Sequence, residues 1–218
     1  MIWVIDDFYP NPDEIRARAL KLNFQEGIDR QTKKRNFPGW RNLRGRESQK
    51  EVEWHSNHVF LRNKLQSIVG ERVNKFHRSH QAFNLGFAEK NNRFSWVHSD
   101  ASQLPDEGGT MYALVIYLNP NPVPRSGTIL FEHDGSVYDI QKKNRVPSKY
   151  YPAIQGNYWD TPLALDPAWK PHTVVSNRYN RCIMYEASML HAPEDAGFGD
   201  TFETARLTQI GFWYGESR

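Results

Sequence analysis

The 218-residue sequence carries a formal net charge of +3, with 39% hydrophobic and 24% charged residues. These values indicate one water-soluble globular domain with a sizeable core. No apolar run approaches the roughly 20 residues that span a bilayer, and no signal-peptide pattern opens the chain. Cys182 is the single cysteine, which excludes an intrachain disulfide and a cysteine-based zinc cluster. We therefore expect a reducing, cytoplasmic location and no membrane partner.

The N-terminal third of the chain, about residues 1–75, is expected to support the fold with helices. After a short opening strand, a helix should begin at Pro12, because Asn11 is a suitable N-cap and proline is favoured at the first helical position. A second helix is expected over about residues 56–69, with Gly70 directly after its end.

Between these two helices, residues 25–50 are polar and interrupted by glycine and proline, which predicts a loop. Residues 30–46 within it hold seven lysines and arginines and no acidic residue, together with Phe37 and Trp40. A solvated loop is one interpretation of this basic stretch. The other is a flap or groove for an acidic substrate, nucleic acid included, where aromatic rings stack and arginines pair with phosphates.

From about residue 76 onward the pattern changes to short strands separated by turns, which is typical of a β-sandwich or jelly roll. Strands are expected near residues 80–88, 94–100, 111–119, 126–134, 171–192 and 205–215. The stretch of about 135–170, rich in Tyr, Trp and Pro, is expected to be an insertion that either packs on the core or covers a substrate as a lid. The prediction is a mainly β fold with N-terminal helices in a single domain, 1–218, whose jelly-roll core spans 76–218.

The sequence FSWVHSD places His98 and Asp100 two positions apart on a predicted strand, so both side chains project from one face. An imidazole and a carboxylate on one face make part of a metal site. A third ligand should lie downstream at a strand end, and His191 fits because it follows the apolar run that contains Cys182. Two histidines and one aspartate form the facial triad of non-haem Fe(II) oxygenases.

Arg206 and Thr208 are predicted to bind a carboxylate. They share one face of a predicted strand with Ile210, because side chains on a strand alternate between its faces. A guanidinium pairs with a carboxylate through two hydrogen bonds, and a neighbouring hydroxyl adds a third donor. This arrangement predicts an anchor for a dicarboxylic co-substrate.

Taken in order, these motifs resemble the Fe(II)/2-oxoglutarate-dependent dioxygenases, in particular the prolyl-4-hydroxylase-like branch. The resemblance covers roughly residues 80–214 and is carried by HSD at 98–100, VIYLN at 115–119, SGTILFEHD at 126–134, His191 and Arg206. It implies a double-stranded β-helix in which Fe(II) is held by His98, Asp100 and His191, and 2-oxoglutarate is bound by Arg206, Tyr117 and Thr208. O2 is the other co-substrate, with ascorbate as an accessory reductant. The distance from His191 to Arg206 is longer than the branch usually shows, so residues 195–203 are expected to bulge.

The resemblance further implies hydroxylation of an aliphatic C–H bond with release of succinate and CO2. The substrate would be a prolyl residue of a peptide or protein, or a free amino acid. Two alternatives stay open: an oxidative demethylase of nucleic acid, favoured by the basic stretch, and a non-catalytic jelly-roll binding protein. Glu186 and Asp195 flank His191, and each is either a surface residue or the partner of its second ring nitrogen.

Overall fold

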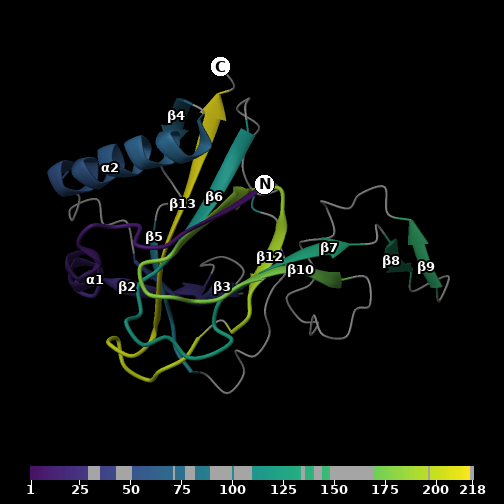
Figure 1. Ribbon diagram of the computed structural model, residues 1–218. Coiled ribbons are helices and arrows are strands. Elements are labelled where there is room, and N and C mark those ends of the chain that lie inside the picture. The colour runs from purple at the N-terminus through teal and green to yellow at the C-terminus, as the bar shows by residue number, and fades with distance from the viewer. Residues whose placement is uncertain are drawn as a thin grey trace.

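The structure is a computed structural model (Figure 1). It describes residues 1–28, 35–42, 51–70, 72–76, 82–88, 100, 110–133, 136–139, 144–147, 169–195 and 197–216. Within these ranges, no helix is both long enough and apolar enough to cross a membrane.

The main sheet runs through the middle of the molecule (Figure 1). Within the described ranges it has eight strands, which pair in antiparallel fashion. In spatial order they are β1 (Ile2–Ile5), β11 (Cys182–Glu186), β6 (Thr110–Tyr117), β13 (Arg206–Glu216), β5 (Ala82–Gly86), β3 (Arg35–Asn42) and β2 (Phe24–Ile28), with β4 (Arg72–Phe76) paired to the far end of β13.

A smaller sheet faces the main one and consists, in the described part of the chain, of β10 (Trp169–Val175), β7 (Thr128–His133) and β12 (Leu190–Pro193) in that order. Leu130 and Val175 from this sheet pack against Tyr117, Tyr185 and Phe212 from the main sheet, and this cluster is the inner core. Two facing antiparallel sheets around such a core form a double-stranded β-helix. The predicted fold class is therefore confirmed.

The opposite face of the main sheet is covered by two helices, α1 (Pro12–Ala19) and α2 (Glu51–Val69), which lie on one side of the molecule (Figure 1). Alternate residues of the strands point toward them, so that Leu85, Leu207 and Trp213 join Leu61 and Leu65 of α2 in an outer core. Pro12 begins α1 as predicted, whereas α2 begins five residues before the predicted start.

The prediction of a loop over residues 25–50 is wrong for residues 25–28 and 35–42, because β2 and β3 pair there and extend the main sheet past β5. The other residues of this range lie outside the described ones. Trp40 packs against the outer core from this hairpin. Gly39 has a φ of +84°, and a Cβ added there would lie 2.2 Å from the carbonyl oxygen of Leu85. Polar composition suggested a loop, but pairing with β5 satisfies the backbone groups and makes these residues a strand.

Part of the predicted insertion also has regular structure. A short hairpin of β8 (Ser136–Asp139) and β9 (Asn144–Pro147) lies beyond β7 and β10, on the side away from α1 and α2 (Figure 1). Residues 148–168 lie outside the described ranges, so the interpretation of the insertion as a lid stays a prediction.

Candidate metal and co-substrate site

Asp100 and His191, two of the three predicted metal ligands, lie side by side. The Nε2 atom of His191 is 3.4 Å from Oδ2 of Asp100, and their side chains are only 8% and 13% exposed. Two ligands that occupy adjacent positions on one metal, each at about 2.1 Å, are roughly 3 Å apart. The spacing therefore suits two neighbouring positions on a single metal ion. His98 lies outside the described ranges, and no cluster of three metal-binding side chains occurs within them.

The imidazole of His191 is oriented by β12. This strand pairs with β7 so that His191 lies opposite Leu130, and the Nδ1 atom is 3.0 Å from the carbonyl oxygen of Met189. A carbonyl only accepts hydrogen bonds, so Nδ1 must carry a proton. Nε2 then points a lone pair at the Asp100 carboxylate unless a cation, either a proton or a metal ion, lies between them. The donor set and its orientation thus fit a divalent metal.

The predicted partners for the second ring nitrogen of His191 have other roles. Oε1 of Glu186 accepts a hydrogen bond from the N-terminal ammonium at 3.1 Å, and Oδ1 of Asp195 accepts one from the backbone N–H of Gly197 at 3.1 Å. The ring is held by the backbone at Met189 instead. Every residue has a backbone carbonyl, so a sequence pattern cannot identify which carbonyl will bind a histidine ring.

Arg206, the predicted carboxylate anchor, begins β13 and is buried. Its Nε atom donates to the carbonyl oxygen of Ser126 at 3.1 Å, and its guanidinium carbon lies 5.8 Å from the centre of the Tyr117 ring. Burial lowers the pKa of Arg206 below its ordinary value, whereas the nearby Tyr117, Asp195 and Glu194 act to raise it. A buried cation is costly without an anion to face, so this position suits an anionic ligand.

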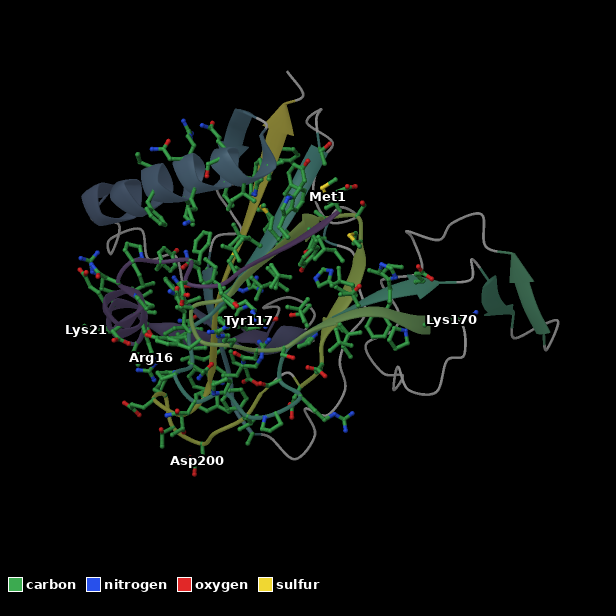
Figure 2. All side chains as sticks on the ribbon, viewed as in Figure 1. Met1, Arg16, Lys21, Tyr117, Lys170 and Asp200 are labelled. Atoms are coloured by element: carbon green, nitrogen blue, oxygen red, sulfur yellow. The ribbon has the colours of Figure 1, made fainter. Side chains whose placement is uncertain are left out.

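Tyr117 and Thr208, the other two predicted anchor residues, lie on the same side of the main sheet. They lie directly opposite each other where β6 pairs with β13, so their side chains share a face. The Tyr117 hydroxyl donates to Oγ1 of Thr128 at 2.7 Å. Burial raises the pKa of Tyr117 to about 12, and the charge of Arg206 opposes this shift. Tyr117 is therefore a neutral donor at physiological pH, and Figure 2 shows it near the centre of the molecule.

Thr128 and Tyr185 belong to this site although the sequence did not identify them. The Tyr185 ring centre is 4.8 Å from that of His191, and the pKa of Tyr185 is raised by burial and by the nearby Asp100 and Tyr117. Tyr185 therefore contacts His191 and belongs to the same buried cluster as Tyr117. In the sequence, Tyr185 is marked only by its alternation with Ile183 in an apolar strand, and an ordinary core residue shows the same pattern.

The segment between His191 and Arg206 folds back on the sheet, which accounts for its length. The N–H of Phe198 donates to the carbonyl of Gly86 at 3.2 Å, the N–H of Ala88 donates to Gly199 at 2.7 Å, and the N–H of Arg206 donates to Phe198 at 3.1 Å. The predicted bulge therefore continues the hydrogen bonding of β5 and leaves Arg206 in register.

Comparison with known proteins extends these observations. The sequence matches a family described as "Family of unknown function (DUF6445)" over residues 1–213. No curated protein matches it.

Several solved structures have similar folds. The epimerase SnoN from nogalamycin biosynthesis, described as non-heme and alpha-ketoglutarate dependent, has a TM-score of 0.59 at 14% identity, over 98% of this chain and 76% of SnoN. HygX from Streptomyces hygroscopicus, with nickel and 2-oxoglutarate bound, has a TM-score of 0.54 at 14% identity, over 98% of this chain and 82% of HygX. A prolyl hydroxylase from Trichoplax adhaerens has a TM-score of 0.53 at 11% identity, over 98% of this chain and 83% of the hydroxylase.

These identities are low, so the similarity concerns the fold. SnoN, HygX and the prolyl hydroxylase share this fold, in which His191 lies on the smaller sheet and Arg206 on the main one. The chain belongs to the DUF6445 family, and its fold is the double-stranded β-helix of the Fe(II)/2-oxoglutarate-dependent oxygenases.

Proposed function

We propose that this protein is a non-haem Fe(II)- and 2-oxoglutarate-dependent dioxygenase that hydroxylates an aliphatic C–H bond. The observation that carries the proposal is the approach of Asp100 to His191 inside the same sheet pair that buries Arg206. A metal-binding pair and a buried cation in one core are the two elements that a chelating keto acid with a distal carboxylate requires.

In this proposal, His98, Asp100 and His191 hold the metal. The carbonyl of Met189 keeps the His191 ring in the tautomer whose Nε2 is a ligand, and Tyr185 packs against that ring. When bound, Fe(II) and 2-oxoglutarate supply the reduction of O2, with release of succinate and CO2 and transfer of one oxygen atom to a C–H bond. Ascorbate would serve only to keep the iron reduced.

The distal carboxylate of 2-oxoglutarate would pair with Arg206 and receive a hydrogen bond from Thr208. Tyr117 supports this anchor, since its ring lies beside the guanidinium and its hydroxyl is fixed by Thr128. The low-dielectric surroundings strengthen each of these interactions and exclude water from the reacting end.

For the substrate we propose a small molecule or peptide, either a free amino acid or a prolyl residue. HygX is described with hygromycin B bound and the Trichoplax enzyme with a peptide fragment, so related folds receive ligands of both kinds. The basic stretch keeps a nucleic-acid substrate as a weaker alternative.

The test is release of succinate from 2-oxoglutarate by the Fe(II)-loaded protein, together with measurement of bound metal. We expect Asp100→Ala to lose both succinate release and metal retention. Asp200→Ala is the matched control, because Asp200 is an exposed aspartate on the loop before β13.

Two results would contradict the proposal. One is a wild-type protein that binds neither metal nor 2-oxoglutarate. The other is an Asp100→Ala variant that retains metal as well as the Asp200→Ala control does. Binding of both ligands without any turnover would instead support a non-catalytic binding protein.

A further inference from the structure

Asn119, the residue that follows Leu118 at the end of the VIYLN motif, lies where β6 stops supporting β13. The backbone N–H of Leu118 still donates to the carbonyl of Leu207 at 3.0 Å. The next residue after Asn119 is Pro120, which has no N–H with which to extend the pairing. Arg206 begins β13 at this end. The proposed carboxylate anchor therefore lies at the end of a strand, where backbone hydrogen bonds open most easily unless other groups hold them.

The side-chain amide of Asn119 provides hydrogen bonds at this point in place of the backbone. Its Oδ1 atom accepts a hydrogen bond from the backbone N–H of Leu207 at 2.7 Å, and its Nδ2 atom donates to the carbonyl of Ala205 at 2.7 Å. These two residues are the neighbours of Arg206 on either side. Asn119 is only 3% exposed, so both bonds are shielded from water. The amide thus holds the backbone of Arg206 through the residue before it and the residue after it.

The remaining hydrogen bonds of Arg206 lead to other parts of the fold. Its backbone N–H donates to the carbonyl of Phe198 at 3.1 Å, and its Nε atom donates to the carbonyl of Ser126, ahead of β7, at 3.1 Å. The guanidinium is therefore placed by two things, the contact with Ser126 and the position of the start of β13. Asn119 fixes the second of these from the side of β6.

We propose that Asn119 is the positioning residue of the carboxylate anchor: by holding Ala205 and Leu207, it sets where the Arg206 guanidinium meets the distal carboxylate of 2-oxoglutarate. This inference rests on the proposed function. Pairing between a guanidinium and a carboxylate through two hydrogen bonds is directional, and a misplacement of about 1 Å can cost about 100-fold. Loss of the amide should therefore weaken binding of the distal carboxylate and spare the metal and the keto-acid end.

The experiment compares two keto acids on one variant. Full-length Ni(II)-loaded Asn119→Ala is titrated calorimetrically with 2-oxoglutarate and with 2-oxopentanoate, in which a methyl group replaces the distal carboxylate. We expect 2-oxoglutarate to bind about tenfold or more weakly than to the wild type, because the guanidinium is misplaced. Binding of 2-oxopentanoate should change by less than about twofold, since this ligand has no carboxylate for Arg206. A merely structural role of Asn119 would weaken both ligands alike.

Tyr9→Phe is the matched control on the same strand. The hydroxyl of Tyr9 donates to Oε1 of Gln209 on β13 at 2.8 Å, and both residues are buried. This variant should be less stable in urea but should bind both keto acids as the wild type does. Urea unfolding also checks the fold of Asn119→Ala. If that variant does not fold, Asn119→Ser takes its place, because a serine hydroxyl can keep one of the two hydrogen bonds.

Three results would overturn the proposal: unchanged binding of 2-oxoglutarate by the Asn119 variant, equal weakening of both keto acids, or the same selective loss in Tyr9→Phe. Failure of the proposed function gives a different result, namely no 2-oxoglutarate binding by the wild type. The positioning is then read from hydrogen exchange of the Arg206 Nε–H in 15N-arginine-labelled protein, with the signal assigned by its loss in Arg206→Met. Faster exchange in Asn119→Ala than in Tyr9→Phe would support the positioning role, and equal exchange would refute it.

Discussion

Replacing Arg206 with methionine should separate ligand binding from folding. The substitution keeps a long side chain at a buried position but removes the charge and the guanidinium donors. Two charge-assisted hydrogen bonds to a carboxylate contribute about 1.5–3 kcal/mol each. Even the lower sum, about 3 kcal/mol, corresponds to roughly 150-fold weaker binding of 2-oxoglutarate.

The same substitution should affect stability far less. Arg206 loses its hydrogen bond to the Ser126 carbonyl, which costs about 1 kcal/mol. In return the protein no longer buries a cation whose pKa is lowered by burial, and replacing a buried charge by an apolar side chain is often neutral or stabilising. We expect the free energy of unfolding without ligand to change by no more than about 1–2 kcal/mol.

The assay is calorimetric titration of 2-oxoglutarate into Ni(II)-loaded protein, with urea unfolding of the same samples. Arg206→Lys retains the charge without the planar fork and should give an intermediate affinity. Metal content should match the wild type in both variants. An unchanged affinity for 2-oxoglutarate in Arg206→Met, or a loss of affinity that merely follows loss of stability, would refute the assignment of Arg206 as the anchor.

Further substitutions test the surroundings. Tyr117→Phe removes one buried hydroxyl donor and should weaken 2-oxoglutarate about fivefold, at a cost of about 1 kcal/mol in urea unfolding; an unchanged affinity would exclude Tyr117 from the anchor. The Cys182 thiol has its pKa raised by burial and should resist a thiol reagent until the protein unfolds; rapid labelling of folded protein would contradict the outer core as described. The pKa of Asp6 is lowered by its hydrogen bond to Arg181, so this pair stabilises the fold above about pH 4 and loses its effect as the pH falls through the lowered value. Asp6→Asn should thus be less stable than wild type at neutral pH and equal to it in strong acid, as measured by thermal unfolding.

Local pattern predicted much of the fold because the elements concerned are specified by their own residues. Proline at the first turn placed the start of α1, and runs of apolar residues bounded by turn signals located β6, β7 and β13. The hairpin of β2 and β3 was missed because its residues are polar and its strand character depends on pairing with β5, a contact between distant parts of the chain.

The sequence by itself predicted which residues make up the candidate site. His98, Asp100, His191, Arg206 and Thr208 were predicted from residue type, spacing and order, and Tyr117 from the resemblance to the dioxygenases. The roles of these residues stay predictions, and His98 lies outside the described ranges.

Only the tertiary structure decided which groups act on one another. It brought Asp100 to His191, gave the His191 ring the carbonyl of Met189 as its partner, and placed Tyr185 against that ring. It also made part of the basic stretch a strand, by pairing β3 with β5. Strand register fixes which side chains share a face, and register depends on pairing between segments that the local sequence does not specify.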